Sequence, residues 1–386
     1  MRTWCDVSID NLEHNFNQIK SKLNNNTKLC GIVKANAYGH GVEEVASNLV
    51  RLGVDYLAVA FIDEAIELRG LGFEQPILIL GNTPKDTVEK VVEYNITAAV
   101  YDVETAKAIS AEAQKQDKVA RIHIKIDTGM GRIGFVPDEQ STLDILEISK
   151  FPNIEIEGIF THFACSDDSD ESMTIKQFES FSNLIERLEK DGLIIPVKHC
   201  CNSAAIIKYP HMHLDMVRAG VILYGMYPSD IDYDIDIKPL MSFKSTIINI
   251  KTMQPGETIS YGATYKVEKP MKVATVAVGY ADGYSRLLSN KGRVLVKGKF
   301  ANILGRICMD QCMIDVTNVH NISIGDEVIL FGADENENLP VEELAVKLGT
   351  INYELPCVIS NRVPRCYIKN NRRIKIHNNL SVVKSL

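Results

Sequence analysis

The sequence lacks the segments that would place a protein in or across a membrane. No run approaches the roughly 18 apolar residues that a spanning helix needs. The N-terminus, MRTWCDVSIDNLEHNF, has neither the basic region nor the apolar region of a secretory signal. We therefore expect a cytoplasmic protein with no membrane segment, unless the chain is a piece of a longer, membrane-anchored one.

Paired cysteines and basic stretches are also missing. The nine cysteines are odd in number and form no C-x-x-C, so neither a disulfide framework nor a structural zinc site is expected. Lys and Arg number 42 against 50 Asp and Glu, a net charge of -8 that gives no footing for nucleic acid. The 386 residues, 45% of them hydrophobic, indicate a globular protein longer than one average domain that acts on small molecules.

Short apolar, β-branched segments recur through the first 225 residues. They are nearly continuous in apolar character, as strands buried on both faces are. Helical periods separate them, as in Val42–Leu52 and Val103–Lys115. The alternation predicts an α/β fold with a (β/α)8 TIM-like barrel, and a doubly wound sheet is the alternative. The eight predicted strands are Leu29–Val33, Tyr56–Ala60, Pro76–Leu80, Ile96–Tyr101, Arg121–Ile126, Ile156–Phe163, Val197–Cys201 and Met216–Tyr224.

The pattern changes after Pro228–Pro239, an acidic, proline-bounded segment that reads as a linker. Beyond it, short alternating runs are divided by glycine turns, which is typical of β structure. One helix is expected at Pro340–Leu348. We place the boundary near residue 235, giving a barrel domain over 1–235 and a β-rich domain over 236–386. The predicted strands of the second domain are Ser245–Lys251, Val273–Val278, Arg293–Val296, Cys312–Val316 and Glu327–Phe331.

Polar and cationic side chains follow the carboxyl ends of the predicted barrel strands, where barrel enzymes carry their active sites. Lys34 follows the first strand in VKANAYGHG, and Arg132 follows the fifth in DTGMGRIG. A lysine held against an apolar wall loses proton affinity and becomes a nucleophile toward carbonyl groups. The simpler interpretation of Lys34 is a solvated loop lysine, and that of His162 is a histidine packed in the core. The later strands contribute His162, Asn202, Ser203, Arg218 and Gly220.

Other sequence patterns give weaker evidence of a functional site. GMGRIG at 129–134 matches the dinucleotide-binding motif, but a helix could begin only near Asp138, too late for that motif. His162 with the nearby Asp167 and Asp168 fits no standard zinc spacing, nor does His199 with the cysteines that follow it, so no metal is predicted. In the β-rich half, the sequence pattern alone does not distinguish Tyr261 from tyrosines that pack in a sheet.

Nine motifs follow one another along the chain: VKANAYGHG, MGRIGF, THFA, NSAA, VRAGVILYG, SYGATY, VGYADGYSR, GRICMDQ and INYELPCVISNRVPR. In this order they resemble the bacterial alanine racemases, which are fold-type III pyridoxal-phosphate enzymes. The resemblance runs from about Trp4 to Tyr367. It implies a barrel followed by a β domain, pyridoxal 5'-phosphate as cofactor and alanine as substrate. It also implies a head-to-tail homodimer whose two active sites lie at the interface.

The resemblance assigns roles to individual residues. Lys34 matches the lysine that holds the cofactor and is the base for the D-enantiomer, and Tyr261 matches the base for the L-enantiomer, supplied by the partner subunit. Arg218 matches the arginine facing the ring nitrogen, with His162 between that arginine and the ring. Lys125 stands where many members carry a carbamylated lysine. The other matches are to cofactor contacts (Tyr38, Asn202, Ser203, Gly220, Val221) and to substrate contacts (Arg132, Tyr280, Met309, Asp310).

The chemistry agrees with two bases, because racemisation removes the Cα proton on one face and returns it on the other. Free lysine and tyrosine have pKa values of about 10.4 and 10, so both pKa values have to move toward the working pH. A nicotinamide dehydrogenase rests only on the misplaced glycine motif. A non-catalytic pyridoxal-phosphate-binding protein is another alternative, although such a protein is a single barrel without a β domain.

One position departs from the family pattern. In ISNRVPR, Asn361 stands where most alanine racemases have a tyrosine that reaches the phosphate and crowds the substrate methyl group. Asparagine is shorter and offers an amide, which leaves room and a hydrogen-bond partner for a hydroxymethyl group. The serine racemases of vancomycin resistance resemble this chain here. We therefore expect activity on alanine and serine, with a dedicated serine racemase as the alternative.

Overall fold

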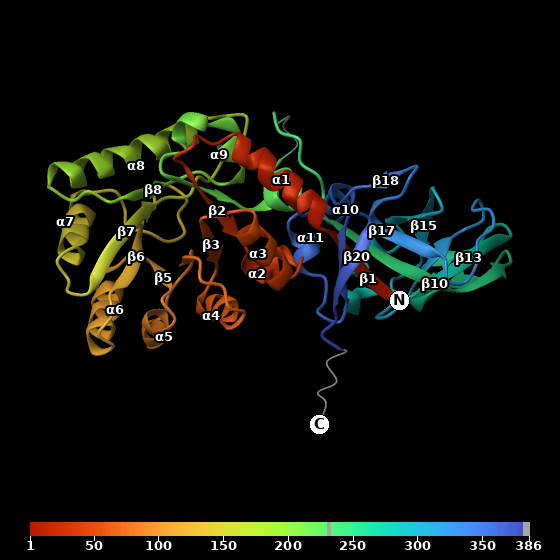
Figure 1. Cartoon of the computed structure of the whole chain (residues 1–386). Helices are drawn as coiled ribbons and strands as arrows, with labels where there is room; N and C mark the ends of the chain where they lie inside the picture. Colours follow the sequence, from red (N-terminus) through yellow and green to blue (C-terminus); the bar gives the residue numbers. More distant parts are fainter. Residues whose placement is uncertain (230–232, 381–386) are drawn as a thin grey trace, which may run out of the picture. The chain divides into compact units, whose positions relative to one another are not determined.

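The computed structural model describes residues 1–229 and 233–380, which form two compact units (Figure 1). The barrel unit comprises Leu12–Ala37 and Val42–Lys238. The β-rich unit comprises Met1–Asn11, Tyr38–Gly41 and the chain from Pro239 onward. The predicted linker, residues 228–239, contains residues 230–232, which lie outside the described ranges.

Eight parallel strands form the sheet of the barrel unit, in the order β8-β7-β6-β5-β4-β3-β2-β9. Backbone hydrogen bonds from Asp215 N to Lys198 O and from Arg218 N to Cys201 O join β8 to β9 and close the ring. This confirms the predicted (β/α)8 barrel. The strands are β2 (Lys28–Ile32), β3 (Tyr56–Val59), β4 (Ile77–Ile79), β5 (Thr97–Val100), β6 (Ala120–Lys125), β7 (Ile154–Phe160), β8 (Val197–His199) and β9 (Met216–Ala219).

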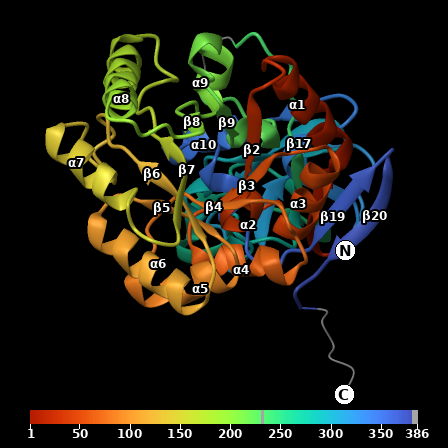
Figure 2. The same ribbon diagram turned by 60° about the vertical axis from the view of Figure 1, so that its left-hand side comes forward.

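Helices cover the outside of these strands, with α4 to α8 following one another around the barrel (Figure 2). Their faces follow helical spacing: in α3, Val42, Val45, Ala46 and Leu49 are buried at intervals of three and four. The helices are α1 (Ile9–Ser21), α3 (Val42–Arg51), α4 (Ile62–Gly70), α5 (Val88–Glu93), α6 (Val103–Lys115), α7 (Glu139–Ile148), α8 (Ser172–Lys190) and α9 (Ser203–Lys208). The element labelled α2 (Lys34–Tyr38) is a left-handed turn.

The eighth predicted strand is longer than the observed one. Met216–Tyr224 was expected as one strand, but β9 ends at Ala219 and a 3-10 helix covers Val221–Tyr224. Gly220 makes the break, with φ -109° and ψ -107°, outside the region that strands occupy. The apolar run continues because the 3-10 helix is as buried as the strand, so hydrophobicity alone did not mark the end.

A ten-stranded sheet forms the β-rich unit, in the order β18-β17-β14-β15-β16-β13-β10-β1-β19-β20. Its strands are β1 (Thr3–Ser8), β10 (Met241–Met253), β13 (Met271–Val276), β14 (Arg293–Val296), β15 (Lys299–Leu304), β16 (Cys312–Asp315), β17 (Glu327–Ala333), β18 (Asn338–Leu339), β19 (Arg365–Lys369) and β20 (Arg372–His377). The smaller elements are the strands β11 (Thr258–Ile259) and β12 (Tyr265–Lys266), and the helices α10 (Val341–Leu348) and α11 (Glu354–Cys357).

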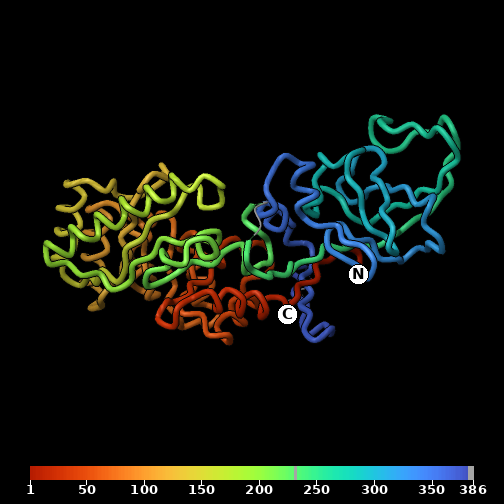
Figure 3. The backbone as a smooth tube through the Cα atoms, turned by 90° about the horizontal axis from the view of Figure 1, so that it is seen from above, coloured from red at the N-terminus to blue at the C-terminus, as the bar shows by residue number. Residues whose placement is uncertain are grey.

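The N-terminal strand belongs to the β-rich unit, although the sequence boundary placed it with the barrel. Strand β1 pairs antiparallel with β10 and parallel with β19, so it lies inside the ten-stranded sheet. The trace in Figure 3 shows the N-terminal end beside the strands from the end of the chain. Sequence patterns missed this because a single strand far from its partners carries no local signal of the sheet it joins.

Candidate active site

Lys34 begins a left-handed turn directly after β2. The four residues Ala35–Tyr38 have φ between +52° and +53°. A left-handed conformation costs L-residues roughly 1–2 kcal/mol each, so the surrounding contacts have to hold it. The carboxylate of Glu64 does so in part: it accepts hydrogen bonds from Ala35 N at 2.6 Å and from Ala60 N at 2.7 Å. Backbone strain of this kind is typical of functional sites.

Arg218 lies inside the barrel at the end of β9, and only 3% of it is exposed. Its Nη2 donates to Thr161 O at 2.8 Å and to Cys200 O at 3.0 Å, and it lies 3.2 Å from His162 Nδ1. Its Nη1 lies 2.9 Å from His199 Nδ1. Carbonyls and histidine nitrogens therefore surround the guanidinium, with no carboxylate among these contacts.

Four basic side chains act electrostatically on His162. Burial lowers the pKa of His162 well below its usual value, and the charges of Arg218, Arg132, Lys125 and Lys34 lower that pKa further, in this order. The imidazole is therefore neutral near pH 7. Since Arg218 can only donate, Nδ1 of His162 accepts and Nε2 carries the proton. The charges of basic residues predicted at the barrel rim thus influence the protonation of His162, which was predicted there as well.

Lys125 ends β6 and is almost fully buried. Burial lowers its pKa to about 7, and the nearby charge of Arg218 contributes. A substantial fraction of this amine is therefore neutral at neutral pH. The Nζ donates to Ile126 O at 2.6 Å.

The loop that carries Arg132 is held by the carboxylate of Asp127. It accepts hydrogen bonds from the backbone N–H groups of Gly129, Gly131 and Arg132, each at 3.0 Å. The glycines of GMGRIG thus wrap around a carboxylate and open no helix. Helix α7 begins only at Glu139, after the N-cap Asp138, as the sequence predicted.

Ser203 and Gly220 are brought together at the ends of β8 and β9. Ser203 Oγ accepts a hydrogen bond from Gly220 N at 3.0 Å, and Val221 begins the adjoining 3-10 helix. Asn202 caps α9: its side chain accepts from Ala205 N and from the hydroxyl of Ser166. A serine hydroxyl and backbone N–H groups therefore meet at one place on the barrel rim, where the sequence expected phosphate contacts.

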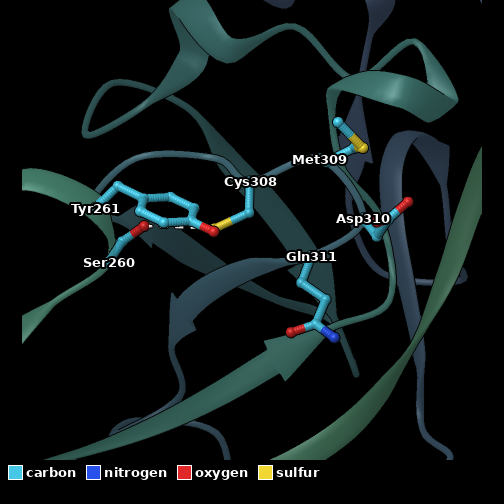
Figure 4. Close-up of a pocket in the computed structure, with 6 residues that line it drawn as sticks. All are labelled: Ser260, Tyr261, Cys308, Met309, Asp310 and Gln311. Atoms are coloured by element: carbon cyan, nitrogen blue, oxygen red, sulfur yellow. Dashed lines mark hydrogen bonds between the residues drawn. The ribbon is translucent and has the colours of Figure 1, made fainter.

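The β-rich unit carries a separate surface pocket, lined by Ser260, Tyr261, Cys308, Met309, Asp310 and Gln311 (Figure 4). Tyr261 begins a short 3-10 turn and is 69% exposed. Ser260, directly before it, has φ +67° and donates its hydroxyl hydrogen to Arg306 O. This hydrogen bond anchors the turn that presents the tyrosine. The pocket brings together Tyr261, Met309 and Asp310, which pattern alone had left apart.

The GYADGY segment forms backbone hydrogen bonds to the residues Cys308 and Met309 that line the pocket. Tyr280 N donates to Cys308 O and Ala281 N donates to Met309 O, both at 3.0 Å. A Cβ at Gly279 would lie 2.3 Å from both of those carbonyl oxygens, so this close approach requires glycine. Tyr280 itself is 42% exposed.

Asp282 was not selected from the sequence, yet it connects three of the motifs. Its buried carboxylate accepts two hydrogen bonds from Arg2, at 2.9 and 2.8 Å, and one from Arg362 Nε at 2.8 Å. Arg362 also contacts Asp310 Oδ1 at 2.7 Å. The residue next to Arg362 is Asn361, so the departure from the family pattern sits beside an arginine tied to the pocket. The sequence signal that could have identified Asp282 is its position in the middle of the motif VGYADGYSR.

Tyr38 is the other predicted residue in the β-rich unit. It ends the left-handed turn, and burial raises the pKa of its hydroxyl. The segment after it is tied down within this unit by Arg365 Nε, which donates to Gly39 O at 3.0 Å. Tyr367 also donates to His40 O.

The barrel rim fits a phosphorylated aldehyde cofactor by the chemistry of its donors. Lys34 would offer an amine for the carbonyl carbon, and the Ser203 hydroxyl and the backbone N–H of Val221 would offer donors for a phosphate, since the N–H of Gly220 already donates to Ser203 Oγ. The Nη groups of Arg218 are engaged by carbonyls and histidine nitrogens, so its Nε–H would be the donor for a ring nitrogen. Among residues 1–229 and 233–380, no group of three or more His, Cys, Asp or Glu side chains is placed to hold a metal ion. Every helix in those ranges is too short or too polar to span a bilayer.

Fold and site together define a barrel protein with a lysine-centred, cationic site and an attached β-rich unit. The family model for the N-terminal domain of alanine racemase matches residues 7–228, and the model for the C-terminal domain matches residues 240–367. The chain belongs to the alanine racemase family, whose cofactor is pyridoxal 5'-phosphate.

Similar proteins cover nearly the whole chain. Alanine racemase of Clostridium tetani is 48% identical over 97% of each chain, and that of Clostridium perfringens is 47% identical over 97% of each. Among solved structures, alanine racemase of Clostridium difficile 630 has a TM-score of 0.96 at 46% identity, covering 98% of this chain and 99% of the other. The Bacillus anthracis enzyme with bound L-Ala-P has a TM-score of 0.93 at 34% identity, covering 98% of each.

Proposed function

We propose that the protein interconverts L- and D-alanine by a two-base mechanism with Lys34 and Tyr261. The observation that carries the proposal is the cationic cluster around a neutral His162, beside a lysine held in a strained left-handed turn. The near full-length similarity to proteins named alanine racemase supports alanine as the substrate.

Each residue has a distinct part in this proposal. When bound, pyridoxal 5'-phosphate supplies the electron sink that makes the Cα proton removable. Lys34 Nζ takes or returns the proton on one face of the substrate, and Tyr261 Oη serves the other. Arg218 would hydrogen-bond the ring nitrogen without protonating it, because a guanidinium keeps its protons. Arg132 and the Met309–Asp310 segment would bind the substrate carboxylate.

A homodimer would complete the site. Tyr261 is 69% exposed and Met309 is 53% exposed in the single chain. A base that exchanges a proton with substrate works best where water is excluded. A second copy of this chain that covers the pocket would supply that shielding, which supports a tyrosine contributed by the partner subunit.

We further propose that serine is a substrate, because of Asn361. Its side chain is shorter than the tyrosine that the family usually carries there, and its amide can pair with a hydroxyl group. The link from the neighbouring Arg362 to Asp310 supports a place for Asn361 near the substrate. A dedicated serine racemase is the second candidate on the same observation.

The test measures kcat/KM for L-alanine and L-serine with the purified protein and its cofactor, in the wild type and in Asn361→Tyr. Turnover of both amino acids is expected in the wild type. In the variant, kcat/KM for serine should fall about tenfold relative to alanine, equivalent to one hydrogen bond with some steric exclusion. An unchanged serine-to-alanine ratio would rule out the role of Asn361. No racemisation of either amino acid would rule out the proposed function.

A further inference from the structure

A chain of hydrogen bonds runs from Arg218 through the interior of the barrel. Arg218 Nη1 lies 2.9 Å from His199 Nδ1, His199 Nε2 lies 2.9 Å from His123 Nδ1, and His123 Nε2 lies 3.2 Å from Glu157 Oε2. Both histidines are fully buried. The chain thus joins the end of β9, at the rim, to residues in the middle of β6 and β7.

The direction of each hydrogen bond follows from its two ends. A guanidinium can only donate, so Nδ1 of His199 accepts and its Nε2 carries the proton. That proton is donated to Nδ1 of His123, whose own proton therefore sits on Nε2. An ionised carboxylate can only accept, and Glu157 is the acceptor at the far end. Each histidine is thus restricted to one tautomer by the chain as a whole.

The pairing of β6 with β7 is irregular where Glu157 meets His123. Ile122 pairs with Ile156 but His123 pairs with Gly158, so Glu157 is the extra residue of a β-bulge. A bulge re-aims the side chain that it contains. A Cβ at Gly158 would lie 2.5–2.7 Å from three atoms of the His123 ring, so the imidazole packs directly on the glycine backbone.

Glu157 is held as a carboxylate by its neighbours. Burial would raise its pKa, but hydrogen bonds from His123 and Tyr56 outweigh burial, and the pKa is lowered overall. Thr97 Oγ1 also donates to Oε2 at 3.4 Å, and Arg121 Nε lies 3.8 Å from Oε1. Burial likewise lowers the pKa of His123 and of His199, so both rings stay neutral and able to accept as well as donate.

We propose that Glu157 is a remote positioning residue of the active site: by accepting the Nε2 proton of His123, it fixes the tautomers that hold the guanidinium of Arg218. Loss of the acceptor would leave a buried N–H unpaired, which favours reorientation of the His123 ring. His199 would then lose its own acceptor, and Arg218 its fixed orientation. The inference rests on the proposed function, because it concerns the same site.

The experiment compares three holoenzyme variants, Glu157→Leu, Glu157→Gln and Glu155→Leu. Glu157→Gln keeps an acceptor oxygen at the same position. Glu155→Leu is the matched control, because Glu155 lies on the same strand and contacts Arg121 at 3.3 Å but not a histidine. The readouts are kcat and KM for L-alanine and the ¹⁵N spectra of labelled histidines, assigned with His123→Gln. Those spectra report which ring nitrogen carries the proton.

The wild type should show His123 and His199 protonated at Nε2 only. In Glu157→Leu, kcat should fall about tenfold with KM nearly unchanged, and the His123 signals should show a second tautomer or exchange. Glu157→Gln and Glu155→Leu should resemble the wild type. Unchanged kcat and spectra in a folded Glu157→Leu would overturn the inference. Equal losses in the Gln and Leu variants would also overturn it, because they would indicate a merely structural role.

A second variant covers failure of Glu157→Leu to fold. Gly158→Ala displaces the His123 ring while Glu157 stays in place, so it should reproduce both the loss of kcat and the change of tautomer. Wild-type kcat with the wild-type tautomers in Gly158→Ala would contradict the inference. The spectra need no turnover, so a protein without racemase activity would refute the proposed function while the histidine chain was still tested.

Discussion

The barrel unit and the β-rich unit differ in the burial of most of their candidate site residues, the exposed Arg132 and the largely buried Tyr38 being the exceptions. At the barrel rim, Arg218 and Lys125 are 3% and 2% exposed, and burial moves their pKa values. In the β-rich unit, Tyr261, Met309 and Tyr280 lie at the surface. The pKa of a buried charged group is set by the residues of its own chain, whereas the environment of an exposed side chain depends on any molecule that covers it. Under the proposed function, the barrel would bind the cofactor by itself, while the base proposed in the β-rich unit would need a second surface to cover it.

The largest expected effects separate the two environments. Lys34→Ala should abolish racemisation and also stable cofactor binding, because it removes the amine proposed to bond the cofactor carbonyl. Tyr261→Phe should lower kcat for L-alanine by about 10³-fold, because it removes one of the two proposed bases, yet leave cofactor binding unchanged. Enzyme assays and the absorbance of the bound cofactor measure the two outcomes.

The control for this pair is Tyr265→Phe, a tyrosine on β12 outside the pocket, which should keep nearly wild-type kcat. If Tyr261→Phe lost the cofactor as Lys34→Ala does, the comparison between the two units would be wrong. If it kept wild-type kcat, the two-base proposal would be wrong.

The next effect concerns stability within the β-rich unit. Asp282→Ala should lower the free energy of unfolding by about 2–3 kcal/mol, because it removes the acceptor of Gly279 N and leaves Arg2 and Arg362 with Asp310 as the remaining acceptor. The loss is less than for a fully buried pair, since both arginines remain partly solvated. Asp310→Ala is the comparison, at less than about 1 kcal/mol, because that carboxylate is exposed. Urea unfolding followed by circular dichroism measures both, and equal losses would contradict the central place of Asp282.

The sequence predicted the barrel better than the β-rich unit for a physical reason. Parallel strands buried on both faces give continuous apolar runs, and α7 begins after Asp138 because a capping side chain marks its start. In the β-rich unit, β1 pairs with strands more than 200 residues away, and no local pattern records a partner at that distance.

The site shows the same division. Side chains that follow strand ends, such as Lys34 and Ser203, could be selected from the sequence because strand direction fixes the edge of the barrel at which they lie, and their roles stay predictions. Glu157 and Asp282 were missed, because a bulge re-aims the first and a turn buries the second. Neither a bulge nor a buried carboxylate in a turn leaves a periodic signal. Residues whose proposed role is exerted through other side chains therefore leave no motif in the sequence.

A tenfold effect is expected from the chemistry of Lys125. Only a neutral amine reacts with carbon dioxide, and the pKa of Lys125 is about 7, so a carbamate should form near pH 8 and be lost as the pH falls through about 7. Removing carbon dioxide should lower kcat/KM about tenfold, since Arg132 would lose an anionic neighbour. ¹³C NMR with labelled bicarbonate detects the carbamate. The signal should be absent from Lys125→Arg, and its persistence in that variant would place the modification elsewhere.

The smallest effect tests whether cofactor affinity belongs to the barrel alone. Ser203→Ala removes one hydroxyl from the proposed phosphate site, and one neutral hydrogen bond is worth about 1 kcal/mol, so the dissociation constant of pyridoxal 5'-phosphate should rise about fivefold. Ser260→Ala is the matched change in the β-rich unit, where the hydroxyl bonds Arg306 O and lies 3.5 Å from Cys308 Sγ, both within that unit. It should leave that dissociation constant unchanged while lowering kcat, because a loosened Tyr261 transfers protons less efficiently. A rise in the dissociation constant with Ser260→Ala as large as with Ser203→Ala would mean that the β-rich unit also binds the cofactor.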